Sequence, residues 1–204
     1  MARAVVYGAL LPEFNVPMLI DTATRQLHYT VVYYGPHESG KTTNLRFIQH
    51  RAMPHEPHAL RSWTDQHGRT AFFDQLSLAF GVQRGLHTTL HLLAVPGADM
   101  YAHTRTALLA NVDGVVFVAD ARPAAQDANQ ASWHELHEAL DAYALGTVPI
   151  VVQSNHHDAA DAVPIHILQA LFAAAHPHVS ASASNGTGVL ATLQTISHRL
   201  LAKV

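Results

Sequence analysis

The stretch from Val31 to Thr43 most constrains what this chain can fold into. An apolar run, Val31–Tyr34, leads into a glycine-bounded segment, Gly35–Thr42, which a helical pattern follows. Gly-x-x-x-x-Gly-Lys-Thr between a strand and a helix is the pattern of a phosphate-binding P-loop. Its glycines let the backbone fold around phosphates, and the N–H groups at the start of the helix face the anion.

The side chains of this loop suggest distinct roles in holding a nucleotide. Lys41 is expected to reach the outer phosphates and the Thr42 hydroxyl to bind Mg²⁺. The chain has only two lysines, Lys41 and Lys203, and otherwise uses arginine, whose guanidinium does not replace a compact ammonium at phosphates. Nucleotide contacts are therefore expected from Gly35, His37, Glu38, Ser39, Gly40, Lys41, Thr42 and Thr43.

Composition narrows the class of protein. A length of 204 residues, 49% of them hydrophobic, fits one medium domain with its own core. A net charge of −3 argues against binding duplex nucleic acid through its phosphates. Cysteine is absent, no apolar run reaches transmembrane length, and the N-terminus lacks a signal-peptide pattern. We expect a cytoplasmic protein.

Histidine is unusually frequent, with 17 copies. His134 and His137 would share one face of a helix, and His87 and His91 one face of a strand, so a metal pair is geometrically possible. A third ligand at a recognisable spacing is missing, so the histidines are better explained by the general composition of the chain.

Apolar periodicity and turn residues predict the order of elements. Residues 1–17 form an N-terminal extension and 18–204 one domain. The expected strands are 19–34, 70–80, 86–94, 114–120, 148–153 and 179–183, and the expected helices are 42–51, 100–111, 124–143, 165–175 and 189–203. The stretch from 53 to 69 is expected to be loop.

This order predicts an α/β fold. Alternating strands and helices predict a mostly parallel sheet with helices on both faces, a three-layer sandwich. The turn Gly81–Gly85 between two β-rich runs predicts one antiparallel hairpin at the sheet edge. A nucleotide would bind where the carboxyl ends of the parallel strands meet.

Two later segments are suited to hold a base at that edge. Asn155 and Asp158 follow a buried strand in an Asn-x-x-Asp arrangement. A carboxylate that accepts from two guanine N–H groups discriminates against adenine, which would leave it unpaired. After the last short strand, Ser182, Ala183 and Ser184 offer backbone N–H groups to a guanine carbonyl. GTP or GDP is therefore the expected ligand.

With these motifs in order, the chain resembles the MglA-type small GTPases, bacterial Ras-like proteins associated with cell polarity and gliding motility. The resemblance implies a P-loop NTPase of the Ras-like kind and covers everything but the N-terminal extension. Ordinary Ras-like proteins carry Asp-x-x-Gly where this chain has Ala94–Gly97. The matching stretches are Val32–Pro36, Ser39–Leu45, Arg69–Asp74, Val95–Gly97, Val112–Asp120 and Gly186–Val189.

The resemblance also implies roles for residues outside the P-loop. Thr70 would be the first-switch threonine that binds Mg²⁺, Arg69 an arginine supplied in cis to the phosphates, and Asp74 a residue of the magnesium shell. Gly97 would contact the nucleotide. The implied partners are a roadblock-fold, MglB-like activator of hydrolysis, which remodels the hairpin between Thr70 and Ala94, and effectors of polarity or motility.

The chain departs from the family pattern at several positions. Ala98 stands where the family has the glutamine that orients the attacking water, and an alanine cannot hold a water. His156 replaces a lysine that packs beside the phosphate loop, which is expected to weaken nucleotide affinity. Glu38 brings a carboxylate close to phosphates, which is unfavourable unless its side chain points to solvent.

Two functions from different classes follow. The first is a GTPase switch with slow hydrolysis, in which Arg69 neutralises charge and another group, such as Asp99 or a partner residue, orients water. The second is a hydrolysis-deficient interaction protein whose bound GTP holds the switch hairpin for a partner. A third reading, an ATP-using kinase, lacks an acceptor site and is disfavoured by Asn155 and Asp158.

Overall fold

The computed structural model describes residues 19–21, 25–56, 59–63, 73–96, 102–172 and 175–202. The strands are β1 (Leu19–Asp21), β2 (Gln26–Tyr34), β3 (Arg61–Trp63), β4 (Phe73–Gln83), β5 (Leu86–Ala94), β6 (Gly114–Asp120), β7 (Ile150–Asn155) and β8 (His178–Ser180). The helices are α1 (Lys41–Ala52), α2 (Ala102–Leu109), α3 (Gln126–Ala142), α4 (Ile165–Leu171) and α5 (Val189–Leu201), with a 3₁₀ turn at Pro123–Ala125.

Eight strands of the described part form one sheet, in the order β3-β4-β5-β2-β6-β7-β8 with β1 paired to β2. The pairs from β5 through β2, β6 and β7 to β8 are parallel. The hairpin of β4 and β5 is antiparallel, and its register shifts at a bulge between Ala79 and Val82. The expected mostly parallel sheet with an antiparallel edge hairpin is confirmed.

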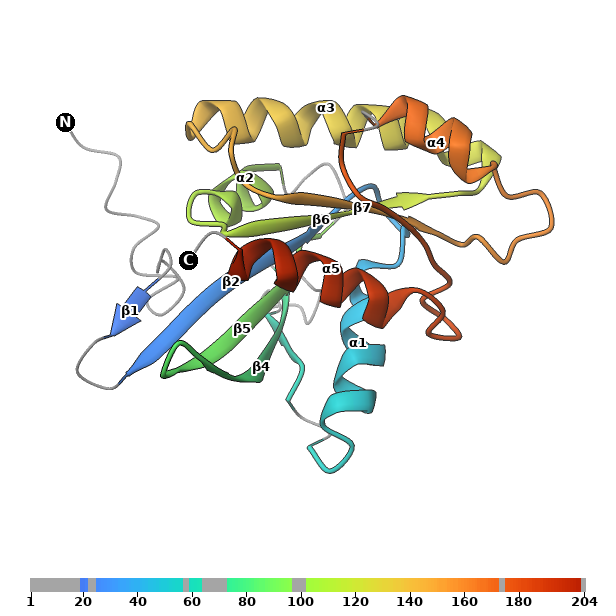
Figure 1. Cartoon of the computed structure of the whole chain (residues 1–204). Helices are drawn as coiled ribbons and strands as arrows, with labels where there is room; N and C mark the ends of the chain where they lie inside the picture. The colour runs from blue at the N-terminus through green and yellow to red at the C-terminus, as the bar shows by residue number, and fades with distance from the viewer. Residues whose placement is uncertain are drawn as a thin grey trace.

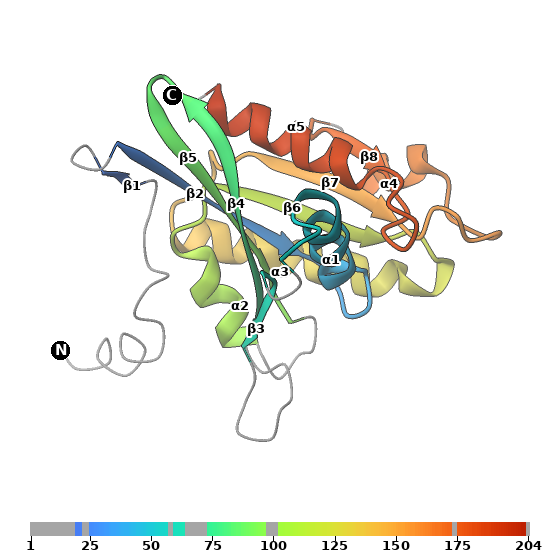
Figure 2. The same ribbon diagram turned by 90° about the horizontal axis from the view of Figure 1, so that it is seen from below.

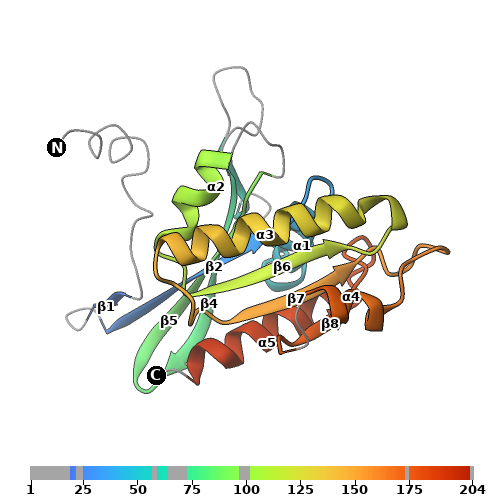
Figure 3. The same ribbon diagram turned by 90° about the horizontal axis from the view of Figure 1, so that it is seen from above.

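Helices cover both faces of the sheet. Figure 1 shows α1 and α5 on one face and α2, α3 and α4 on the other, and Figures 2 and 3 view these two faces in turn. Strands β6 and β7 are buried at every position, as their continuous apolar character predicts for strands covered on both sides. The result is the three-layer arrangement expected from the sequence.

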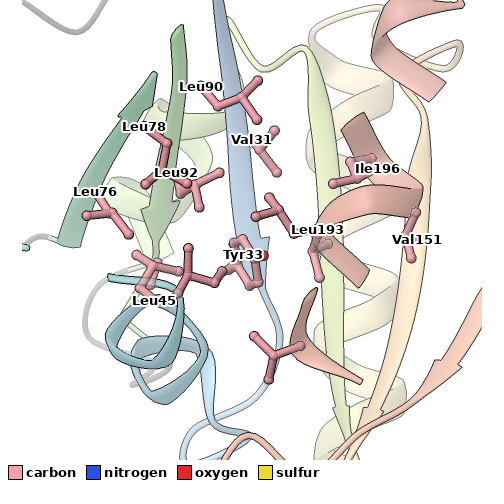
Figure 4. Close-up of a cluster of buried hydrophobic side chains, with 14 of the residues drawn as sticks. Val31, Tyr33, Leu45, Leu76, Leu78, Leu90, Leu92, Val151, Leu193 and Ile196 are labelled. Atoms are coloured by element: carbon pink, nitrogen blue, oxygen red, sulfur yellow. The ribbon is translucent and has the colours of Figure 1, made fainter. Parts of the chain in front are cut away.

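Each helical layer encloses its own apolar core. On the α1 and α5 side, side chains of alternate positions in the central strands meet apolar side chains of the helices. Figure 4 shows Leu45 of α1, Val151 of β7 and Leu193 of α5 pointing into this core together with Tyr33 of β2. The second core lies under α2, α3 and α4 and includes Phe117, Leu136 and Phe172.

The structure corrects several expected boundaries. The run expected as one strand over 19–34 is two antiparallel strands, because the chain turns at Arg25, whose φ is 54°. Residues 61–63, expected to be loop, form β3 and pair with the start of β4. The strand expected to begin at 148 begins at Ile150, because Pro149 has no N–H to donate. Helix α4 ends at Leu171, before the expected residue 175.

Other expectations concern parts of the chain outside the described residues. The N-terminal extension 1–17 belongs there, so the proposed division at residue 18 stays a prediction. In the described part, none of the helices is long and apolar enough to cross a membrane. Among the same residues, histidines and carboxylates do not gather in groups of three or more that could hold a metal ion.

Candidate nucleotide site

The phosphate loop joins the carboxyl end of β2 to α1, and its backbone conformation requires its glycines. Gly35 has a φ of 143°, and a Cβ there would lie 2.3 Å from the carbonyl oxygen of Val118 in β6. Gly40 has a φ of 96°, and a Cβ would lie 2.1 Å from Nδ2 of Asn155. Both contacts are far too short for a real side chain, so this curled loop tolerates only glycine at the two positions.

Lys41 is held across the loop. Its Nζ donates to the carbonyl oxygens of Gly35 at 2.9 Å and Pro36 at 2.6 Å, and its side chain is 5% exposed. Burial, and secondarily the charge of Arg105, lowers the pKa of Lys41 to about 7. A buried ammonium beside a curled loop at a helix start suits a phosphate group, which would supply a compensating negative charge.

The tip of the loop points to solvent. The side chains of His37 and Glu38 are 71% and 72% exposed and lie 3.6 Å apart at Nε2 and Oε1. Glu38 has a left-handed backbone with a φ of 59°. The condition under which a carboxylate is acceptable in this loop is therefore met, because water screens its charge.

On one side of the loop, Thr42 contacts β4. Its hydroxyl donates to Oδ2 of Asp74 at 2.5 Å, and the other oxygen of that carboxylate accepts from Ser62 Oγ in β3 at 2.6 Å. Asp74 is 4% exposed and lies opposite Ala94 in the register of β4 and β5. Ala94 occupies the position where ordinary Ras-like proteins have an aspartate. The carboxylate near the Thr42 hydroxyl thus comes from the neighbouring strand.

On the other side of the loop, Asn155 connects three segments. Its Nδ2 donates to the Ser39 carbonyl at 2.7 Å, and its Oδ1 accepts from the Ala183 N–H at 2.8 Å. The side chain is 1% exposed, so both hydrogen bonds are shielded from water. The Asn-x-x-Asp segment, the phosphate loop and the loop after β8 are consequently held together at one edge of the sheet.

His156 takes part in the same contact. Its Nε2 lies 3.1 Å from the Glu38 carbonyl oxygen, and its backbone φ is 60°. A histidine N–H from the Asn-x-x-Asp segment therefore donates to the backbone of the phosphate loop. Asp158, two residues farther on, is exposed. Its position leaves the carboxylate accessible to a ligand placed at this edge.

The loop after β8 uses part of its hydrogen-bonding capacity internally. The Ser182 N–H donates to the Thr187 carbonyl at 3.0 Å, and the Ala183 N–H donates to Asn155. Of the three N–H groups expected to face a guanine carbonyl, that of Ser184 has no acceptor within the described part of the chain. Ser184 is exposed and remains the candidate for that role.

Comparison with known proteins identifies the family. No family model matches the chain. The mutual gliding-motility protein MglA of Myxococcus xanthus (strain DK1622) is 37% identical to it over 188 residues, which span 91% of this chain and 96% of that protein. The chain belongs to the MglA family of small GTPases. This membership implies the P-loop Ras-like fold that the sequence resemblance predicted.

The residues expected to act at the outer phosphate are not among those described. Arg69, Thr70, Gly97, Ala98 and Asp99 all lie outside the described part, so their expected roles stay predictions. By contrast, the residues of the phosphate loop, Asp74, Asn155, Asp158 and Ser182–Ser184 lie around one edge of the sheet. The surroundings of the second group are therefore described by the structure, and those of the first group are not.

Sequence patterns missed a buried ion pair beside the site. Arg105 of α2 is 5% exposed and donates to Glu135 of α3 through three hydrogen bonds of 2.7 to 3.0 Å. Burial by itself would lower the pKa of Arg105, but the hydrogen bonds and charge of Glu135, with a further contribution from Tyr34, raise it. The pair fastens α2, which follows the Val95–Gly97 segment, to α3. An arginine and a glutamate 30 residues apart carry no local signal.

A second missed pair lies at the end of β6. Asp120 is 1% exposed and accepts from both Nε and Nη2 of Arg122, while Asn129 of α3 bonds the Asp120 backbone N–H and carbonyl. These contacts fix the turn that leaves β6 next to the phosphate loop. The hydrogen bond and charge of Asp120 raise the pKa of Arg122, with a further contribution from Glu38.

Proposed function

We propose that this protein is a guanine-nucleotide-binding switch that binds GTP and GDP with Mg²⁺ and hydrolyses GTP slowly. The observation that carries the proposal is the convergence of the glycine-curled phosphate loop and the Asn155 bridge at one edge of the sheet. MglA-family membership supports the same assignment.

The proposed roles follow from the contacts described above. Lys41 exchanges the carbonyl oxygens of Gly35 and Pro36 for phosphate oxygens. Asn155 keeps the loop after β8, residues 182–188 and hereafter the base loop, in place. Asp158 accepts from guanine N–H groups, and the Ser184 N–H donates to the guanine carbonyl. Adenine would leave the Asp158 carboxylate without donors, which is the physical basis of the preference.

Thr42, Asp74 and Thr70 are the residues proposed to hold Mg²⁺. Hydroxyl and carboxylate oxygens are suitable ligands for this ion, and a hydroxyl already bonded to a buried carboxylate forms an oxygen-rich corner beside the loop. Bound Mg²⁺ neutralises the charge that develops on the phosphates. The Asp74 carboxylate orients the Thr42 hydroxyl and adds negative charge beside the ion.

Arg69 is proposed to neutralise charge on the outer phosphate in the slow hydrolysis reaction. A residue in this role is worth roughly 10³ to 10⁵ in rate where such arginines act in GTPases. It does not orient the attacking water, a task for which Ala98 has no polar atom. We propose that Asp99 or a residue of a partner supplies that group.

The remaining parts of the proposal concern cellular context. The 18–204 segment acts as one GTPase domain, located in the cytoplasm, that signals in cell polarity or motility through partner proteins. A roadblock-fold, MglB-like protein is the proposed activator of hydrolysis. The name of the Myxococcus relative, a mutual gliding-motility protein, supports the motility assignment.

A second candidate function is a GTP-binding interaction protein that does not hydrolyse GTP. Ala98 favours it, since the position of the water-orienting glutamine carries a methyl group. In this alternative the bound GTP holds the switch hairpin in one conformation for a partner. Both candidates require nucleotide binding and differ only in turnover.

One experiment separates these functions. Binding of fluorescent GDP and of a non-hydrolysable GTP analogue is measured with Mg²⁺ and with competing ATP, and single-turnover hydrolysis of GTP follows. The switch predicts tight guanine-specific binding with slow turnover. Binding without measurable turnover supports the interaction protein, displacement by ATP contradicts the guanine assignment, and failure to bind either guanine nucleotide sinks both.

A further inference from the structure

Behind the phosphate loop, three polar side chains from different elements meet in the apolar core. They are Asn44 of α1, Gln153 of β7 and Thr192 of α5, and each is 0% exposed. Asn44 and Gln153 are 109 residues apart in the sequence. Their neighbours Leu45, Val151 and Leu193 point into the core of Figure 4. Uncompensated polar groups at such a place are costly, so their hydrogen bonds need a full account.

Every polar hydrogen of the three side chains has an acceptor. Asn44 Nδ2 donates to Gln153 Oε1 at 2.8 Å and to the Gly40 carbonyl at 3.0 Å. Gln153 Nε2 returns a bond to Asn44 Oδ1 at 2.9 Å and donates to Thr192 Oγ1 at 2.9 Å. Thr192 Oγ1 donates to the Gly188 carbonyl at 2.8 Å.

This accounting fixes the orientation of both amides. Turning over the Asn44 amide would bring its oxygen against the Gly40 carbonyl, and turning over Gln153 would remove the donor to Thr192. Each such change leaves a buried donor or acceptor unpaired. The side chains therefore form one specific connection between three elements.

The two ends of the connection are the backbones of two ligand loops. Gly40 is the last residue of the phosphate loop before α1, and its carbonyl accepts from Asn44. Gly188 precedes α5 at the end of the loop that begins at Ser182, and its carbonyl accepts from Thr192. The chain of hydrogen bonds thus runs from the phosphate loop to the base loop through the core, and not through the edge of the sheet where the nucleotide is proposed to bind.

We propose that Asn44, Gln153 and Thr192 are positioning residues that set the separation between the phosphate loop and the base loop. This role rests on the proposed binding of guanine nucleotides. When both loops are held at the right separation, binding of the phosphates brings the base to its own pocket at a high effective concentration. A ligand that spans both loops gains from that arrangement, and a fragment that touches only one does not.

The test compares two threonines of α5 that make the same helical hydrogen bond. Thr192 donates to Gly188 and also accepts from Gln153, whereas the partly exposed Thr195 donates to Ala191 at 2.8 Å. Thr192→Val and the matched control Thr195→Val remove the same atoms. Competition against fluorescent GDP is measured with GDP, guanosine and inorganic pyrophosphate, and thermal stability is measured alongside.

Thr192→Val is expected to weaken GDP binding about tenfold, the scale of one lost buried hydrogen bond, while guanosine and pyrophosphate each change less than about twofold. Thr192→Ser keeps the hydroxyl and is expected to bind all three ligands as the wild type does. Thr195→Val should also match the wild type. A purely structural role lowers the melting temperature without separating GDP from its fragments.

Several outcomes overturn the proposal. Unchanged GDP affinity in folded Thr192→Val contradicts coupling of the loops, and so does a loss for pyrophosphate as large as that for GDP, which would indicate local damage to the phosphate loop. A wild type that binds pyrophosphate and guanosine but gains nothing with GDP contradicts it as well. A wild type that binds no GDP overturns the proposed function itself. If Thr192→Val does not fold, the paired change Asn44→Leu with Gln153→Met carries the same comparison, because it removes both members of the reciprocal amide pair and strands neither.

Discussion

The phosphate loop is held differently on its two sides. On the β7 side, Asn155 makes buried hydrogen bonds to two backbone groups, Ser39 O and Ala183 N. On the β4 side, the contact joins two side chains, Thr42 and Asp74, and both of these are proposed magnesium-binding residues. The β7 side lies next to the proposed base site and is called the base side, and its contacts to backbone groups hold the loops in a fixed arrangement. The β4 side lies next to the proposed magnesium site and is called the metal side, and its contact between side chains can be exchanged for contacts to an ion.

The largest effect is expected from removing the Asn155 side chain, which holds the base side of the phosphate loop. Asn155→Ala leaves the Ser39 carbonyl and the Ala183 N–H buried without partners, which should lower the free energy of unfolding by about 2 to 4 kcal/mol. GDP affinity should fall about a hundredfold, because the phosphate loop, the Asn-x-x-Asp segment and the base loop lose the side chain that joins them. Denaturant titration and fluorescent GDP binding measure the two quantities.

The matched control for this change is Asn185→Ala. Asn185 lies in the same base loop, where its Oδ1 accepts from the Thr187 N–H at 2.9 Å at an exposed place. It should cost little in either measurement. Equal losses of GDP affinity in the two variants would show that Asn155 has no special part in holding these loops.

Removing the charge of Asp74 on the metal side should affect only the magnesium-dependent part of GDP binding. Asp74→Asn keeps the shape of the side chain but removes its charge, so the gain in GDP affinity produced by Mg²⁺ should fall about thirtyfold. Affinity in EDTA should stay as in the wild type. The control Ser62→Ala removes the other hydrogen bond to the carboxylate and leaves the charge. An unaltered Mg²⁺ response in Asp74→Asn would exclude this residue from the magnesium shell.

A glutamine at position 98 should restore a water-orienting group beside the proposed magnesium site. Ala98→Gln is expected to speed single-turnover GTP hydrolysis about tenfold, because a positioned amide can orient the attacking water. Ala128→Gln, at an exposed position of α3, serves as the control. Turnover that does not respond to Ala98→Gln would mean that residue 98 is not at the water position.

The smallest effect is a pH dependence of Lys41. Its pKa is lowered to about 7 in the folded chain from 10.5, so between these values the unfolded chain binds a proton that the folded chain lacks. This group therefore makes the free energy of unfolding rise with pH from about 7 to 10.5.

Phosphates should restore the charge of Lys41. GDP binding then takes up a proton, and GDP affinity should fall about fivefold between pH 7 and pH 8 through this group alone. Calorimetry in buffers of different ionisation enthalpy measures the proton uptake. Binding without proton uptake at pH 8 would contradict the lowered pKa.

Much of this molecule could be predicted from local patterns. The glycine spacing of the phosphate loop, the apolar runs of β6 and β7 and the turn between β4 and β5 depend on neighbours in sequence, and each was correctly assigned. Asn155 could be singled out as part of an Asn-x-x-Asp motif, but its hydrogen bonds to other loops could not. Ser39 and Ala183 become its neighbours only once the parallel strands are ordered.

Features that join distant segments were missed for the same reason. Strand β3 has only three residues and forms because Phe73–Gln75 offers it an edge. The carboxylate of Asp74 reaches Thr42 because the hairpin register puts it opposite Ala94. His156 was expected only to weaken binding, whereas its ring lies within hydrogen-bonding distance of the Glu38 carbonyl. Nothing at residue 156 itself indicates which loop it will meet.

The reciprocal amide pair of Asn44 and Gln153 also constrains how this sequence can drift over evolution. Replacing either amide alone by an apolar side chain strands its buried partner, whereas replacing both can be nearly neutral for stability. Homologous chains should therefore change positions 44 and 153 together or leave both untouched. A lineage that replaced both amides would keep the fold, but its phosphate loop and base loop would be held less firmly at one separation.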